Sequence, residues 1–308
     1  MVAAVDNRKS VLITGCSPGG IGNALAREFH RNGLRVFATA RSSKHIEDLE
    51  ALGIETLSLV VDDEESIKEC YAEVERRIGD KGLDYLVNNA MTSMLKQWRI
   101  DHTVPAMDVD IAEARQTFET NFFGVILMCQ TFLPLLIKAQ GTIVQIGSVA
   151  GIIPYVFGSV YNASKAALHS FSDTLRVELA PFGVKVTTVI TGGVQSRIAR
   201  VKRVLPPTSL YRPIEAEYNR RVSHSQEGAM PHDAYARSVV TQVLYGSAPW
   251  RWLWPWAQGS KKWIWEGNRS WIIRFVTGGW LWFGLFDRVF TNMFNLWKLR
   301  GTWGGWKR

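Results

Sequence analysis

A tyrosine and a lysine four residues apart, in the run YNASKAAL, are the first residues that could do chemistry. If Tyr161 and Lys165 begin a helix, they lie on one face of it, one turn apart. A phenol is a poor acid or base near neutrality, but a nearby ammonium favours the phenolate and lowers its pKa. The pair can then pass a proton to or from a carbinol oxygen. Taken alone, such a pair is more often found on the surface of an ordinary helix.

Two polar residues upstream extend this pair. Ser148 ends an apolar, β-type run thirteen residues before Tyr161, and its hydroxyl could hydrogen-bond to a substrate carbonyl and polarise it. Asn121 lies in an earlier helical stretch, where its amide could hold a water chain to Lys165. We interpret these four residues as a candidate catalytic group.

Apolar β-type runs alternate with helical patterns along residues 10–190 and must position this group. Strands are expected at 10–14, 35–41, 56–62, 83–90, 141–148 and 184–190, and helices at 22–32, 66–78, 111–137 and 161–180. The alternation predicts an α/β fold with a Rossmann-type doubly wound parallel sheet. Ligands of such sheets bind beyond the carboxyl ends of the strands, so we expect one cleft there.

The run TGCSPGGIG at residues 14–22 raises a question about cofactor binding. A strand, a glycine-rich turn and a helix usually cradle a dinucleotide pyrophosphate. Here, however, four residues separate Gly15 from Gly20 and one separates Gly20 from Gly22, which is not the G-x-G-x-x-G spacing. The run is either a cofactor loop of unusual spacing or a turn that is rich in glycine.

Taken in order, these motifs resemble the short-chain dehydrogenase/reductase family. Asn121, Ser148 and the Tyr-x-x-x-Lys run at 161–165 are similar to its catalytic tetrad, and LDYLVNNA at 83–90 to its fourth-strand motif. The resemblance covers roughly residues 8–245 and implies that residues 14–22 form the cofactor loop, one residue longer than is common. It implies cofactor contacts by Gly15, Ser17, Gly20, Ile21, Gly22, Arg41, Asp62, Asn89, Tyr161, Lys165, Val194 and Ser196.

The end of the second expected strand indicates which cofactor is used. Members that bind NAD place an acid there for the ribose 2′-hydroxyl, whereas this chain has Ala38-Thr39-Ala40 followed by Arg41. The Arg41 guanidinium suits a 2′-phosphate, and Ser17 could help, so we expect NADPH. Asp62 resembles the family's adenine-contacting aspartate, although Asp62 or Asp63 could instead cap a helix.

The glycine loop and the run EFHRNGLRVFATAR resemble a fungal subgroup typified by NADPH-dependent 1-acyldihydroxyacetone-phosphate reductase. The resemblance implies reduction of a ketone on a lipophilic substrate, with 1-acyl-dihydroxyacetone phosphate as one candidate and a polyketide or terpenoid intermediate as the alternative. A non-catalytic NADPH-binding scaffold is a further alternative, against which the intact tetrad argues. Met91 and Thr191 stand where the family usually has Gly and Pro.

The region after residue 195 resembles the family's variable substrate lid. Its basic residues could meet an anionic substrate group or belong to a solvated helix; they are Arg197, Arg200, Lys202, Arg203 and Arg212. His224 and His232 are expected at the surface.

Charge and tryptophan divide the chain in two. Residues 250–308 hold ten Lys or Arg and two Asp or Glu, which accounts for the net charge of +8, and 12 of the 13 tryptophans. We therefore predict a reductase domain at 1–249 and a basic, Trp-rich tail at 250–308. Apolar residues of the tail recur at helical spacing, from Ile272 to Trp297, which suits an amphipathic segment in a membrane headgroup region. Packing against the domain or a second subunit is the alternative, and no nucleic-acid motif accompanies the tail.

Other features bear on location and partners. The uncharged stretches 120–137 and 139–164 are interpreted as a buried or interface helix and as a core strand with a loop, not as membrane spans. Three separated cysteines predict neither disulfides nor a metal site, and the N-terminus has no secretory pattern. We expect an intracellular protein at the endoplasmic reticulum or lipid-droplet surface, or otherwise in the cytoplasm, with a homodimer as a possible assembly.

Overall fold

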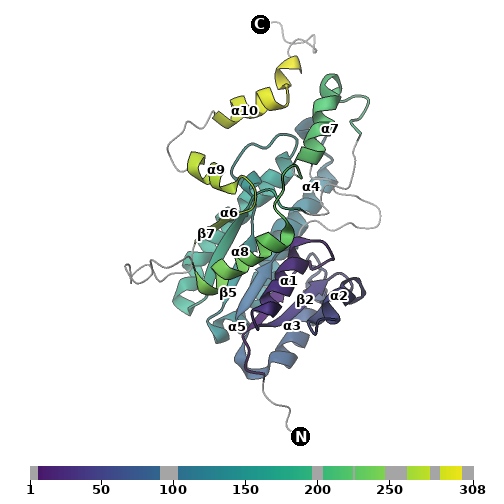
Figure 1. Cartoon of the computed structure of the whole chain (residues 1–308). Coiled ribbons are helices and arrows are strands. Elements are labelled where there is room, and N and C mark those ends of the chain that lie inside the picture. Colours follow the sequence, from purple (N-terminus) through teal and green to yellow (C-terminus); the bar gives the residue numbers. More distant parts are fainter. Residues whose placement is uncertain are drawn as a thin grey trace.

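The structure is a computed structural model. It describes residues 6–90, 103–195, 204–224, 226–246, 262–277 and 285–299. Its centre is a seven-stranded sheet in the order β3-β2-β1-β4-β5-β6-β7, and every neighbouring pair is parallel (Figure 1). The strands are β1 (Ser10–Ile13), β2 (Arg35–Ala40), β3 (Glu55–Ser58), β4 (Tyr85–Asn88), β5 (Thr142–Ile146), β6 (Lys185–Thr191) and β7 (Trp263–Glu266). This confirms the predicted doubly wound α/β fold.

Helices cover both faces of the sheet, as the buried, apolar strands require. The helices are α1 (Ile21–Arg31), α2 (Glu47–Glu50), α3 (Glu64–Ile78), α4 (Ile111–Phe118), α5 (Gly124–Ala139), α6 (Ser159–Leu179), α7 (Glu215–His224), α8 (His232–Tyr245), α9 (Ser270–Phe275) and α10 (Leu285–Met293). One core cluster joins α1 and α8 to the sheet through residues such as Phe29 and Val240. A second joins α3, α5 and α6 to the other face through residues such as Val74, Phe132 and Leu168.

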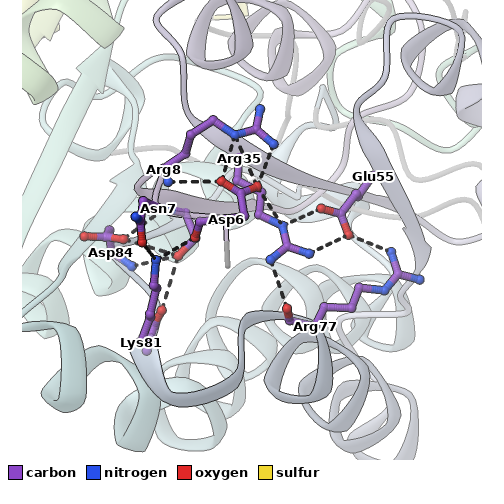
Figure 2. A network of polar contacts seen from close by, with 10 residues as sticks. Asp6, Asn7, Arg8, Arg35, Glu55, Arg77, Lys81 and Asp84 are labelled. Atoms are coloured by element: carbon purple, nitrogen blue, oxygen red, sulfur yellow. Dashed lines mark hydrogen bonds and ion pairs between the residues drawn. The ribbon is translucent and has the colours of Figure 1, made fainter. Parts of the chain in front are cut away.

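Charged side chains gather at the amino ends of the first strands, away from the edge where ligands bind (Figure 2). Arg35, at the start of β2, donates to Glu55 at 2.6 Å and lies 3.8 Å from Asp6. Asp84, just before β4, accepts from the main-chain N–H of Ser10 at 2.8 Å. These bonds link the starts of four strands. Asp84, the aspartate of the LDYLVNNA motif, therefore has a structural role, which is to join the start of β4 to the start of β1.

The uncharged stretch 120–137 belongs to a long helix that packs on the sheet. Within residues Ile111–Ala139, an 18-residue window would pass a length and composition test for a membrane span, and 39% of that window is buried. Met128, Phe132 and Leu136 on α5 belong to the second core cluster, as a core helix requires. Hydropathy of this kind is equally expected of a helix that faces a sheet.

The seventh strand comes from the segment that the sequence analysis assigned to the tail. Ile264 on β7 is paired with Val189 on β6 and is 1% exposed. Next to it, Trp263 donates from Nε1 to Asp173 on α6 at 3.1 Å, and Lys262 forms an ion pair with the same carboxylate at 2.9 Å. The sheet therefore extends beyond residue 249, although the division at 249/250 itself stays a prediction.

The helices of this segment divide the predicted amphipathic face. Phe290 on α10 is buried in an apolar cluster with Ile153 and Phe294, and Met293 and Leu296 pack against this cluster. Helix α10 lies close to α7 in Figure 1. Phe275 on α9 is 64% exposed. Val289, which was predicted on the same face, is exposed to a smaller degree, at 38%. Part of the face thus packs on the domain, as the alternative interpretation expected, and part is open to solvent. Residues 250–261, 278–284 and 300–308 of the predicted tail lie outside the described residues.

Candidate active site

Ser148, Tyr161 and Lys165 lie together beyond the carboxyl end of β5. Ser148 precedes a short 3-10 turn, Val149–Gly151, and its Oγ accepts from the Ala150 N–H at 3.1 Å. The same hydroxyl hydrogen-bonds to the Tyr161 side chain. Tyr161 and Lys165 lie near the start of α6, with Lys165 Nζ 5.9 Å from the centre of the Tyr161 ring. The structure therefore brings these three predicted residues into one group.

Burial sets the protonation states of this group. It raises the pKa of Tyr161 to about 12, and the hydrogen bond with Ser148 offsets part of that rise. It lowers the pKa of Lys165 to about 8, while Lys165 Nζ donates to the Ile146 carbonyl at 2.9 Å. The sequence analysis expected Lys165 to lower the tyrosine pKa; the net shift of Tyr161 is upward, because its phenolate is removed from water. At neutral pH the phenol keeps its proton, as a proton donor must.

Asn121 joins the group through α6. It lies in a π-helical segment, Glu119–Phe123, between α4 and α5, and is 1% exposed. Its Nδ2 donates to Ser164 Oγ at 3.1 Å, and Ser164 Oγ donates to the main-chain carbonyl of Tyr161 at 2.8 Å. Insertions of this kind inside helices are frequent at functional sites. The amide is thus held beside the tyrosine's own turn of α6.

The glycine run forms a tight loop between β1 and α1. Gly15 has a φ of +74°, and a Cβ on it would lie 2.9 Å from Ala90 Cα. A Cβ on Gly22 would lie 2.5 Å from Asn89 Nδ2, which donates to the carbonyls of Thr14 and Gly15 at 2.9 and 3.1 Å. Only glycine fits such close approaches. Asn89 therefore holds the loop from the end of β4, which agrees with its predicted place at the cofactor site.

The loop and helix α1 together fit a dinucleotide pyrophosphate. Gly20 is the N-cap of α1, which begins at Ile21; no side chain caps it and its first turn contains no acidic residue. The main-chain N–H groups and the positive end of the helix dipole are therefore directed at a site that suits an anion. This answers the question of the unusual spacing, because the longer loop still delivers a helix N-terminus to the carboxyl edge of the sheet.

The residues expected at the adenosine end lie at neighbouring strand ends. Ser17 and Arg41 are both exposed, after β1 and β2 respectively. Asp62 accepts from Gln116 Nε2 at 2.6 Å and from Thr120 Oγ1 at 3.3 Å, so it ties α4 and the π-helical segment to the end of β3. Asp63, not Asp62, caps a helix: it accepts from two N–H groups at the start of α3. The capping alternative for Asp62 is therefore wrong.

Other predicted residues divide between described and undescribed parts of the chain. Val194 follows β6, is buried and pairs with Met230 in an isolated bridge. Thr191, where the family usually has proline, hydrogen-bonds through its hydroxyl to the Tyr235 hydroxyl at 2.7 Å. Arg212 is paired with Glu215 on the surface. Ser196, Met91, Arg197, Arg200, Lys202 and Arg203 lie outside the described residues.

An aromatic cluster beside this group was missed by the sequence analysis. His224 was expected at the surface, but its Nδ1 lies 2.6 Å from the hydroxyl of Tyr155, which lies between Ser148 and Tyr161 in the chain. Arg221, 6% exposed, stacks over the Tyr155 ring at 3.4 Å. Phe290 of α10 packs against the same ring. No local pattern marks these contacts, because they join segments far apart in sequence.

The fold and the side chains at its carboxyl edge define a Rossmann-type oxidoreductase site. Residues 9–204 match the family described as short chain dehydrogenase, and the chain belongs to this family.

Relatives of this chain are fungal dehydrogenases and reductases. It is 38% identical to the short-chain dehydrogenase virD of Hypocrea virens, over 96% of each chain. It is 45% identical to the NADPH-dependent 1-acyldihydroxyacetone phosphate reductase of Schizosaccharomyces pombe, over 68% of this chain and 70% of that protein. Among solved structures, a short-chain dehydrogenase from Streptomyces avermitilis is similar with a TM-score of 0.70 and 26% identity, covering 96% of this chain and 99% of that one.

Proposed function

We propose that this enzyme uses NADPH to reduce a ketone on a lipophilic substrate, with Tyr161 as the proton donor. The observation that carries the proposal is the half-buried, protonated Tyr161, hydrogen-bonded to Ser148 and close to Lys165 beyond the end of β5. The bound cofactor supplies the hydride. The chain supplies the proton and holds the carbonyl group.

The roles of the side chains follow from their protonation and place. The Ser148 hydroxyl hydrogen-bonds to the carbonyl oxygen and orients it. Tyr161 donates its proton to that oxygen, and the Lys165 ammonium stabilises the phenolate that remains. By its resemblance to the family, Lys165 also binds the nicotinamide ribose, and Asn121 supports the proton relay. A non-catalytic scaffold would not need this complete set.

The choice of NADPH rests on the end of β2. The last residues of that strand, Thr39 and Ala40, offer no carboxylate to a ribose 2′-hydroxyl, and the exposed Arg41 follows directly. A guanidinium forms strong, often bidentate bonds with a phosphate. The S. pombe relative is NADPH-dependent by name, which supports the same choice.

For the substrate, we propose 1-acyl-dihydroxyacetone phosphate first. The S. pombe relative supports it. Arg220, Arg221 and Arg269 act on His224 or Tyr155 together with one carboxylate, Glu227, and this balance of charge is positive, which suits a phosphate. The apolar cluster of Ile153, Phe290 and Phe294 suits an acyl chain. The alternative is a polyketide or terpenoid ketone, as the resemblance to the fungal subgroup implied. The virD match extends over more of this chain than the reductase match does, and that relative's name gives no substrate, so it leaves this alternative open.

A panel assay tests this proposal. The full-length enzyme is incubated with NADPH or NADH and with 1-acyl-dihydroxyacetone phosphate, its non-phosphorylated analogue and neutral lipophilic ketones. We expect NADPH-dependent reduction, fastest with the phosphorylated substrate. A preference for a neutral ketone would favour the alternative, and no turnover of any ketone despite NADPH binding would favour a scaffold.

We also propose that α9 attaches the enzyme to an intracellular membrane or lipid-droplet surface. Its outward side exposes Trp271 (69%), Phe275 (64%) and Ile272 (40%), next to the exposed Arg274. Apolar rings beside basic groups suit the headgroup region.

A homodimer remains an expectation, which sedimentation of the full-length protein would test.

Vesicle binding tests the attachment. The full-length protein should bind anionic vesicles more tightly than neutral ones, and less tightly at high salt. Trp271→Ser with Phe275→Ser should weaken binding roughly tenfold or more, because less apolar area enters the interface. Val177→Ser with Phe182→Ser is a matched control, since both side chains are exposed elsewhere, at 61% and 53%. Equal binding by both variants would contradict attachment through α9.

A further inference from the structure

His169 lies directly behind Ser148. It is on α6, one turn after Lys165, and is 5% exposed. Its Nε2 accepts a hydrogen bond from the main-chain N–H of Ser148 at 3.2 Å. The imidazole must therefore be neutral, with its proton on Nδ1, for this bond to form.

The main chain on both sides of Ser148 is packed against the same ring. A Cβ on Gly147 would lie 2.4 Å from His169 Nε2, and one on Gly151 would lie 2.7 Å from His169 Cε1. Any other residue at either position would push the ring or the main chain away. The two glycines thus let the imidazole reach the backbone of the serine.

Lys165 and His169 hold this segment at two successive points. Lys165 Nζ donates to the Ile146 carbonyl at 2.9 Å, and His169 accepts from the Ser148 N–H. Two side chains one turn apart on α6 therefore fix the main chain on either side of Gly147. The end of β5 cannot shift relative to the helix that carries Tyr161 without breaking one of these bonds.

The position of the imidazole is itself supported by β7. The ring of Trp263 lies 5.8 Å from the His169 ring, centre to centre, and its Nε1 is bonded to Asp173, one turn further along α6. Asp173 in turn pairs with Lys262. The segment beyond residue 249 thus contacts His169 through the Trp263 ring, and His169 in turn bonds to Ser148 of the catalytic group.

We propose that His169 is a positioning residue that fixes Ser148 for its hydrogen bond to the substrate carbonyl and to Tyr161. The proposal rests on the catalytic role of Ser148 given above. Burial and the charge of Lys165 lower the pKa of His169 to about 4, against the opposite effect of Asp173, so that the ring stays neutral at neutral pH. A neutral acceptor is what the Ser148 N–H requires.

A double-mutant cycle tests this role. His169→Leu removes the acceptor and keeps an apolar side chain in the site; His169→Gln places an amide oxygen near the position of Nε2. Each is made in the wild-type enzyme and in Ser148→Ala, and kcat and KM are measured with NADPH and the fastest ketone of the panel. NADPH affinity is measured separately by fluorescence titration.

We expect His169→Leu to lower kcat by roughly tenfold, about the effect of one lost hydrogen bond, and to leave NADPH affinity within about twofold. His169→Gln should recover most of kcat. In the Ser148→Ala background, His169→Leu should cause no further loss, because residues that act as one unit are not additive. If His169→Leu does not fold, His169→Asn, whose shorter amide cannot reach the Ser148 N–H, replaces it.

The same factor of loss in both backgrounds would overturn the proposal, as would a His169→Gln variant no better than His169→Leu. If Ser148→Ala alone keeps full activity, the proposed role of Ser148 fails and this inference fails with it. If Ser148→Ala is impaired but the two substitutions are additive, only the role of His169 fails.

Discussion

Replacing Ile264 by alanine tests whether the segment beyond residue 249 belongs to the fold. Ile264 is 1% exposed, lies in the middle of β7 and packs in the core cluster that joins α1 and α8 to the sheet. Truncating a buried isoleucine to alanine costs about 2–5 kcal/mol, from lost burial and the cavity that remains. Domains are stable by about 5–15 kcal/mol in total, so this is a large fraction. We expect the melting temperature to fall by roughly 4 °C or more.

The assay is thermal and urea unfolding of the full-length protein, followed by circular dichroism. Trp271→Ala on α9 is the matched control, because this larger side chain of the same segment is 69% exposed. We expect the control to change the free energy of unfolding by less than about 0.5 kcal/mol. If Ile264→Ala is as stable as wild type, or no less stable than the control, then β7 is not a strand of the sheet and our account of this segment is wrong.

Three further predictions concern the catalytic and cofactor sites. Arg41→Ala should weaken NADPH binding more than NADH binding, by about 1.5–3 kcal/mol for a lost bond to a charged group; equal losses in calorimetric titrations would contradict the assignment. Ketone reduction should decline as pH rises through about 8, where Lys165 loses its proton, and a kcat profile that stays flat well above this pH would exclude the ammonium from the mechanism. Gly22→Ala would place a Cβ 2.5 Å from Asn89 Nδ2 and should sharply reduce NADPH affinity; Gly53→Ala, at positive φ but remote from the loop, should lower stability and leave the affinity unchanged.

The sheet and the catalytic group could be predicted because their signals are local. Each of the six expected strands is a short run rich in apolar and β-branched residues and is followed by turn residues, and parallel strands bring their carboxyl ends to one edge. Ser148 follows such a run, and the spacing of Tyr161 and Lys165 places them on one side of a helix. Their places in the fold follow from periodicity and from the rules of α/β topology, and their interpretation as a catalytic group rests on the resemblance to the family's tetrad.

What could not be predicted depends on contacts between distant segments. β7 is only four residues long, and WIWE lies in a basic, Trp-rich region where its apolar residues could equally face a membrane. Its pairing with β6 becomes visible only when the Ile264 side chain is seen in the core. His169 has no motif of its own, since its role arises from two glycines that let the backbone of Ser148 approach it.

The protonation of the catalytic group also required the folded structure. The sequence places an ammonium near a phenol, which by itself predicts a lowered phenol pKa. Burial depends on everything packed around Tyr161, and it raises the pKa to about 12. The sign of such a shift is decided by three-dimensional surroundings, which spacing alone does not give.

Isotope transfer tests the central claim, ketone reduction with Tyr161 as the proton donor, most directly. NADPH carrying deuterium at both C4 positions of the nicotinamide is incubated with 1-acyl-dihydroxyacetone phosphate and the lipophilic ketones, and the products are examined by mass spectrometry. We predict an alcohol with one deuterium on the former carbonyl carbon, formed on the order of a hundredfold more slowly by Tyr161→Phe, which should still bind NADPH. An unlabelled product, or a Tyr161→Phe variant that forms the labelled alcohol at the wild-type rate, would contradict the account.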